Sequence, residues 1–191
     1  MTTRFRQQAD AHIVDRAAAL FARHGFAQTS VQAVADAVGL SKAGLLHHYP
    51  SKQALWDAVL GHAGTLGSSA CDAVAELPLG RARDLRAVEL LADVALSHPG
   101  LVALLLAPAT RGEDEDPDLG PSSDAALRAF GVDPATAEPE RLVRVLGALG
   151  ALAVLALAAS QGGHGAAWRA HLIATSFDAL GHARPRPDLE V

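Results

Sequence analysis

Residues 25–52 read GFAQTSVQAVADAVGLSKAGLLHHYPSK, and this stretch decides the fold of the N-terminal part of the chain. The run TSVQ matches a capping box, in which the Thr29 hydroxyl and the Gln32 amide satisfy exposed backbone donors. Gly39 interrupts the helix that begins there, Ser41 is a good N-cap for a second helix, and Pro50 stops it. The stretch therefore predicts two short helices with a tight break between them.

A longer helix is predicted before this stretch and another after it. Upstream, apolar residues recur with the 3.6-residue period of one helix face, and Gly25 stands where a left-handed C-cap would end the helix. The residues of that face are Ile13, Ala17, Leu20 and Phe21. Downstream, Ser51 can cap a fourth helix that carries Leu55 and Val59 inward. The first fifty residues are therefore predicted to contain a compact unit of three helices.

The rest of the chain keeps a helical pattern and shows no convincing strand or internal repeat. Helices are predicted over about 84–97, 100–107, 123–130, 138–160 and 165–181. The composition of 111–123 is typical of an exposed loop, and that of 184–191 of a frayed tail. The predicted fold class is all-α with about nine helices, comprising an N-terminal unit over 1–52, a larger helical domain over 53–183 and the tail.

The composition favours a globular cytosolic protein. Half of the 191 residues are apolar, which is enough to bury a substantial core. The single cysteine, Cys71, excludes an internal disulfide framework and favours a reducing cytosol. We expect it to be a buried small side chain, with a thiol sensor as the lesser alternative. Residues 1–10 are polar and lack the apolar core of a secretory signal.

The net charge of −5 conceals an asymmetry along the chain. Residues 1–52 carry four arginines and two lysines against three aspartates, whereas the remainder is acidic. Whole-chain charge decides little about a nucleic-acid partner, because phosphates are bound by a local basic surface. The small positive surplus is equally compatible with an ordinary fluctuation, so charge alone does not choose between the two interpretations.

Residues 145–159 form an uninterrupted run of apolar residues and glycines. A membrane span needs about 20 apolar residues, and this run is made largely of Ala and Gly and begins directly after Arg144. A helix that is apolar on all sides is more often buried between packed helices or subunits. The run therefore favours a buried helix over a membrane span, and we expect no membrane partner.

The helix predicted at residues 41–49 has one face that packs and one that is free. On a helical wheel, Leu45 and Tyr49 point together toward the other two helices. The opposite face and its flanks carry Lys42, Ala43, Gly44, Leu46, His47 and His48. Small side chains allow the backbone of such a helix to approach base edges in a major groove, which is about 12 Å wide. Lys42 and Lys52 suit phosphates, Lys52 with the added help of a helix N-terminus.

The full string is more specific than the spacing of its helices. GF at 25–26, TSV at 29–31, VA at 34–35, AVGLSK at 37–42, Leu45, HYPSK at 48–52 and AL at 54–55 closely resemble the N-terminal domain of TetR-family regulators. The resemblance covers about residues 10–60. It implies an all-helical homodimer with a homeodomain-like, trihelical DNA-binding domain and a larger domain for ligand binding and dimerisation. By the resemblance, the positions that touch DNA are Thr29, Ser41, Lys42, Ala43, His47, His48, Tyr49 and Lys52.

Two residues depart from the family pattern. Members often have a tyrosine where this chain has Leu46, and a threonine or alanine where it has Gly44. Leu46 cannot donate a hydrogen bond to a phosphate, and Gly44 costs the helix about 0.5–1 kcal/mol relative to alanine. The preferred DNA sequence therefore cannot be carried over from the family.

The resulting prediction is a cytoplasmic, nucleoid-associated transcriptional regulator. We expect a repressor that leaves a near-palindromic operator when a small hydrophobic or amphipathic effector binds. Dimerisation is assigned to the helices at about 138–160 and 165–181. The effector pocket is assigned to Val94, His98, Leu101, Leu105, Leu146 and Leu149, with His98 as the one polar anchor, although for each residue taken singly an ordinary core role is the favoured alternative.

Two other classes of function fit the sequence less well. An enzyme is disfavoured, because the sequence has no glycine-rich phosphate loop, no nucleophile elbow and no paired carboxylates in a plausible pocket. The histidines outside residues 47–48 are scattered without metal-ligand spacing, so neither a metal nor another cofactor is expected. The third class is a helical interaction protein in which the C-terminal helices serve only dimerisation.

Overall fold

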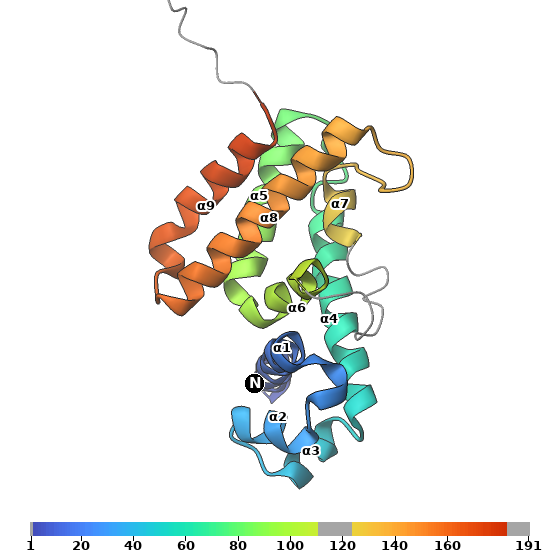
Figure 1. The fold of residues 1–191 in the computed structure, drawn as a ribbon, viewed down its shortest axis with the longest axis vertical. Coiled ribbons are helices and arrows are strands. Elements are labelled where there is room, and N and C mark those ends of the chain that lie inside the picture. Colours follow the sequence, from blue (N-terminus) through green and yellow to red (C-terminus); the bar gives the residue numbers. More distant parts are fainter. Residues whose placement is uncertain (1, 111–123, 183–191) are drawn as a thin grey trace, which may run out of the picture. The chain divides into compact units, whose positions relative to one another are not determined.

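The computed structural model describes residues 2–110 and 124–182, and all regular secondary structure in this part of the chain is helix (Figure 1). This confirms the predicted all-α class. The predicted loop at 111–123 and the predicted tail at 184–191 lie outside the described residues. The helices are α1 (Thr2–Gln28), α2 (Val31–Ala37), α3 (Lys42–His48), α4 (Lys52–Asp72), α5 (Arg81–Ser97), α6 (Pro99–Thr110), α7 (Ala125–Ala129), α8 (Pro139–Gln161) and α9 (Gly165–Ala179).

The chain divides into two compact units, each described here by itself. One comprises Met1–Ser68 and Ser97–Ser123, and the other Ser69–Leu96 and Asp124–Val191. The N-terminal helices are therefore grouped with α6, which comes much later in the chain. Helix α4 begins at Lys52, where the N-terminal domain was predicted to end. It continues to Asp72 and includes Gly61, Gly64 and Gly67.

The first unit is built on an aromatic cluster that joins α1 to α4. Trp56 lies edge-on to Phe21 and to Phe26, with ring centroids 5.1 and 5.4 Å away. Gly25 separates the two phenylalanines and has φ 77° and ψ 160°, a combination that is almost confined to glycine. The backbone breaks at the predicted residue, but its ψ lies outside the left-handed helical region of the predicted cap, and Phe26 packs against the core.

Helix α6 completes the same unit by packing on α1. The backbone N–H of Leu101 donates to the Asp15 carboxylate at 3.0 Å, which satisfies one of the open donors in the first turn of α6. A side chain at Gly100 would collide with the backbone carbonyl of Asp15. Burial raises the pKa of the Asp15 carboxyl above its ordinary value, although the backbone donors of Leu101 and Gly100 oppose the shift.

The second unit contains an antiparallel pair, α8 and α9, joined by a tight turn at Gly162 and Gly163 (Figure 1). Asp84 on α5 is fully buried and has two partners. The Arg141 guanidinium lies 2.8 Å from one of its carboxylate oxygens, and His182 Nε2 lies 2.7 Å from the other. Since an unpaired buried carboxylate would be very costly, this pairing fixes α5 against the start of α8 and the end of α9.

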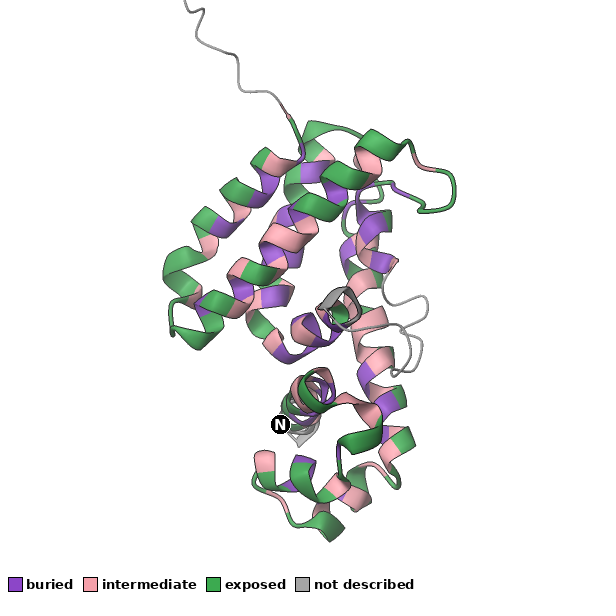
Figure 2. Ribbon diagram, viewed as in Figure 1, coloured by how far each residue is buried: buried purple, intermediate pink, exposed green. Residues whose placement is uncertain are grey.

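Helix α8 keeps much of its apolar surface uncovered. Val143, Leu146 and Val154 are 67%, 50% and 59% exposed, while Val145, Leu152 and neighbouring alanines are buried (Figure 2). Of the described helices, α8 alone is by itself long and apolar enough to cross a membrane, and only a third of its most apolar window is buried. Core helices of soluble proteins share this length and composition.

Candidate nucleic-acid interface

Helix α2 begins one residue later than the predicted capping box requires. Its N-cap is Ser30, whose hydroxyl accepts the Ala33 N–H at 3.0 Å. The Thr29 hydroxyl instead donates to the Gly25 carbonyl at 2.7 Å, and the Gln32 amide donates to Asp36. The prediction of Thr29 as the cap was wrong. Both residues are good caps, but the Thr29 hydroxyl is bonded to the Gly25 carbonyl at the end of α1, and Ser30 caps α2.

A glycine turn joins α2 to α3. Gly39 has φ +71°. Its N–H bonds to the Asp36 carbonyl at 3.3 Å, and the Leu40 N–H bonds to the Ala35 carbonyl at 2.9 Å. These are the two hydrogen bonds of a Schellman motif, which ends a helix with a residue in the left-handed conformation. The interruption predicted at Gly39 is therefore a defined turn, and it sets the direction in which α3 leaves.

Helix α3 is anchored at its cap and along one face. The Ser41 hydroxyl accepts the Gly44 N–H at 3.0 Å, which confirms Ser41 as the N-cap. Leu45 is fully buried in the core of the first unit, and Tyr49, half-buried, ends the helix as its C-cap. Helix α4 is capped in the same way, because the Ser51 hydroxyl accepts the Ala54 N–H.

The opposite face of α3 is open to solvent (Figure 2). Gly44 and Leu46 are intermediate in exposure, and the other predicted contact residues of this face are exposed: Ser41, Lys42, Ala43, His47 and His48. The face is therefore a small-residue strip with a lysine at its start and two histidines at its end. Such a strip lets a helix backbone approach base edges closely while its ends meet phosphates.

Two of the predicted contact residues are engaged within the protein. Thr29 is buried and its hydroxyl is directed to the backbone of α1. The Lys52 ammonium donates to the carbonyls of Phe26 and Ala27 at 2.8 and 3.1 Å and lies 4.5 Å from the centroid of the Phe26 ring. Lys52 thus closes the end of α1 by satisfying carbonyls that the helix leaves open.

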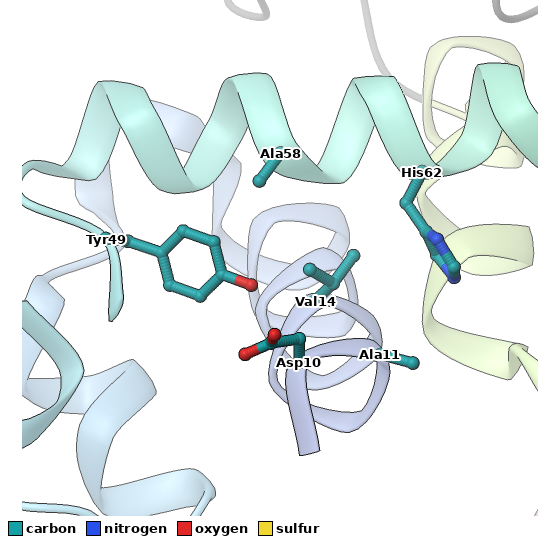
Figure 3. Close-up of a pocket in the computed structure, with 6 residues that line it drawn as sticks. All are labelled: Asp10, Ala11, Val14, Tyr49, Ala58 and His62. Carbon is teal, nitrogen blue, oxygen red and sulfur yellow. The ribbon is translucent and has the colours of Figure 1, made fainter. Parts of the chain in front are cut away.

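Asp10 lies beside the end of α3, and no pattern in the sequence marks it as a site residue. His48 Nδ1 lies 3.2 Å from the Asp10 carboxylate. Figure 3 shows the Tyr49 hydroxyl directed toward the same carboxylate, across an open depression of about 430 Å³. Burial, and then the negative charge of Asp10, raise the pKa of the Tyr49 hydroxyl above its ordinary value of 10.0. A residue on α1 therefore sets the electrostatic surroundings of two predicted contact residues.

His62 lies at the other end of this depression (Figure 3). Its ring meets the His98 ring edge-on with centroids 5.1 Å apart, and its buried Nε2 has no hydrogen-bond partner among the described residues. Burial, followed by the nearby His98, lowers the pKa of the His62 imidazole. A neutral imidazole is thereby favoured at this position.

The residues predicted to form an effector pocket fall in both compact units. His98, Leu101 and Leu105 belong to the first, and Val94, Leu146 and Leu149 to the second. Leu101 is buried, whereas Leu105 and Leu146 are 38% and 50% exposed. The assignment of these six residues to one pocket remains a prediction.

Comparison with known proteins identifies the segment that carries this interface. Residues 13–59 match the family model described as bacterial regulatory proteins, tetR family. Over 48 residues the chain is 42% identical to the HTH-type transcriptional repressor KstR2 of Rhodococcus jostii (strain RHA1). That alignment spans 25% of this chain and 24% of the relative. The segment that carries the Ser30–Tyr49 motif, within helices α1 to α4, is thus similar to the helix-turn-helix domain of TetR-family transcriptional regulators.

Proposed function

We propose that this chain is a repressor that binds operator DNA through α3 and is released by a small hydrophobic or amphipathic effector. The observation that carries the proposal is the helix-turn-helix itself. Its turn is fixed by Gly39, its recognition helix is anchored through Leu45, and its other face is exposed. The relative that matches this segment is named a transcriptional repressor.

The proposed contacts divide into those that read bases and those that bind phosphates. Ala43, Gly44 and His47 lie where a groove-entering helix meets base edges, and the Ala43 methyl suits a thymine methyl. Lys42 and His48 flank that strip and suit phosphates. For Lys52, two of the three ammonium donors are used by carbonyls of α1, and the third is proposed to reach a phosphate.

The experiment that tests this proposal is selection of bound duplexes from a random DNA pool, followed by titration of the winning sequence at several salt concentrations. Lys42→Ala is expected to weaken binding to all sequences about equally and to lower the salt slope by about 1. Ala43→Ser is expected to change which base is preferred at one position. If no duplex shows salt-sensitive retention, the proposal is wrong.

Dimerisation is proposed to use α8 and α9. The exposed apolar side chains of α8 described above, together with Trp168 on α9, give this helix pair a surface suited to a second copy. Gly147 and Gly150 have free space where a side chain would stand, so a second helix can approach closely. A two-fold dimer would present two recognition helices to DNA and favour a near-palindromic operator.

The proposed effector binds among the helices that follow α4 and shifts the population of DNA-binding conformers. The apolar character of Val94, Leu101, Leu105, Leu146 and Leu149 supports an apolar ligand body, and His98 offers a polar anchor. A screen for compounds that raise the melting temperature identifies candidates. A true effector is expected to weaken binding to the selected duplex, and His98→Ala is expected to reduce this response without changing DNA affinity in the absence of ligand.

A further inference from the structure

We infer that Asp10 is a positioning residue of the DNA interface, which holds the His48 ring so that binding a phosphate requires His48 to take up a proton. The inference rests on the proposed function, because it concerns how the same surface meets DNA. It predicts that operator binding weakens as the pH rises.

The orientation of the ring follows from the contact between the two side chains. His48 Nδ1 lies 3.2 Å from an Asp10 carboxylate oxygen. An ionised carboxylate has acceptors only, so Nδ1 must carry the proton in this contact. In the neutral ring the second nitrogen, Nε2, then has a lone pair and no proton.

A phosphate cannot bond to that form of the ring, since phosphate oxygens on DNA are also acceptors. A hydrogen bond from Nε2 to DNA therefore needs a second proton, which comes from solvent and converts the ring to imidazolium. In the complex the imidazolium would lie between the Asp10 carboxylate and a phosphate. Two neighbouring anions favour the charged form of a histidine.

The same arrangement penalises binding when His48 is neutral. A neutral His48 does not neutralise the Asp10 carboxylate, so a negative charge stands at the edge of a surface that must approach phosphates. Protonation of His48 removes this net charge as well as supplying the donor. Both effects act in the same direction, so the complex binds the proton more tightly than the free protein does.

Other titratable groups near this contact are few among the described residues. Tyr49 keeps its hydroxyl proton, because burial and Asp10 raise its pKa. His62, across the depression, is favoured in the neutral form by burial. His47 is a second histidine on the same exposed face, with its ring centroid 6.1 Å from that of His48. The test must therefore separate His48 from His47.

The affinity of the full chain for a duplex selected from a random pool at pH 6 is measured by fluorescence anisotropy between pH 6 and 8 at constant salt. For the wild type, Kd is expected to rise by up to about tenfold per pH unit for each proton taken up. His48→Gln is expected to remove most of this rise, and Asp10→Asn to flatten the profile and bind more tightly than the wild type at pH 8. Asp10→Asn with the wild-type slope would overturn the inference.

Two variants serve as matched controls. Asp36→Asn removes one carboxylate from the exposed face of α2, where its partner is the Gln32 amide, and is expected to keep the wild-type slope. His47→Gln is expected to keep the part of the pH dependence of Kd that Asp10→Asn removes, because that part is assigned to His48. If Asp36→Asn flattens the profile as much as Asp10→Asn, the effect is one of general charge and the inference is wrong.

Nitrogen-15 NMR of the histidine rings gives an independent readout. In the free protein at pH 8, His48 is expected to carry its proton on Nδ1, and in the DNA complex at pH 7 both nitrogens are expected to be protonated. A proton on Nε2 in the free protein would overturn the inference even if the duplex is bound well. Failure of every duplex to bind would instead refute the proposed function itself.

Discussion

Lys52 was predicted to bind a phosphate, and its contacts in the structure also give it a role in the stability of the fold. Its ammonium satisfies two carbonyls at the end of α1 and lies over the Phe26 ring. We expect Lys52→Ala to lower the free energy of unfolding by about 1–2 kcal/mol, since the carbonyls lose a charged donor. Chemical denaturation measures the change. Lys42→Ala, on an exposed position, should stay within about 0.5 kcal/mol of the wild type.

Gly39 allows a second prediction about a single residue. Its φ of +71° costs an L-residue about 1–2 kcal/mol, although a side chain there would meet no atom within 4 Å. Gly39→Ala should therefore destabilise the chain by that amount through backbone strain alone. Gly39→Asn should cost less, because asparagine tolerates this conformation better. Equal losses for the two variants in thermal unfolding would show that strain is not the cause.

At this scale the sequence predicts some roles well and others poorly. Ser41 and Gly39 could be assigned because a cap and a left-handed turn depend on local backbone geometry. Thr29 and Ser30 are neighbours that can both cap a helix, and the structure uses Ser30, the better cap, although the capping-box spacing to Gln32 pointed to Thr29. The roles of Lys52 and Asp10 depend on partners 25 and 38 positions away in the chain, and a single sequence gives no sign of such contacts.

The packing of α6 on α1 is the element-scale feature most open to test. A methyl group at Gly100 would collide with the Asp15 carbonyl, which belongs to rigid helical backbone. We expect Gly100→Ala to destabilise the chain by about 1–3 kcal/mol, as overpacking typically does. Gly61→Ala is the control, because α4 has free space at that position. It should be neutral or stabilising by up to about 1 kcal/mol.

The Asp15 carboxyl links this same packing to pH. Its pKa is raised above 3.8 in the folded state, so the native chain binds a proton more readily than the unfolded chain does. The contribution of Asp15 to stability is therefore greatest below pH 3.8 and falls as the pH rises through the raised pKa. Asp15→Asn lacks this titration. The stability of the wild type relative to Asp15→Asn should fall between pH 4 and 7, and a rise would contradict the assigned shift.

Elements with a strong period were predicted closely, and those shaped by tertiary contacts were not. Helices α5, α8 and α9 begin within three residues of the predicted positions, because each has an uninterrupted helical pattern. Helix α4 runs past Gly61, Gly64 and Gly67 to Asp72, since packing overrides the weak helix propensity of glycine. The grouping of α6 with the N-terminal helices depends on tertiary contacts, which local sequence patterns do not predict.

At the scale of the whole molecule, the exposed apolar face of α8 is the feature that the single chain leaves unexplained. If it forms the dimer interface, Val154→Glu should convert the protein to a monomer in analytical ultracentrifugation while leaving its helical content unchanged. Leu79→Glu is the matched control, because Leu79 is also strongly exposed and belongs to the same compact unit. A dimer that survives Val154→Glu and Leu146→Glu together would place the interface elsewhere.

The proposed dimer and the helix-turn-helix together predict how the operator must be built. Two recognition helices fixed by one interface would sit about 34–36 Å apart, so their half-sites must lie on one face of the duplex. Inserting about 5 base pairs between the half-sites turns one of them to the far side and should reduce wild-type affinity to that of a single half-site. Val154→Glu should bind weakly and show no dependence on the insertion, because each monomer reads one half-site alone. Equal sensitivity of the two proteins would mean that α8 does not couple the recognition helices, even if both bind DNA.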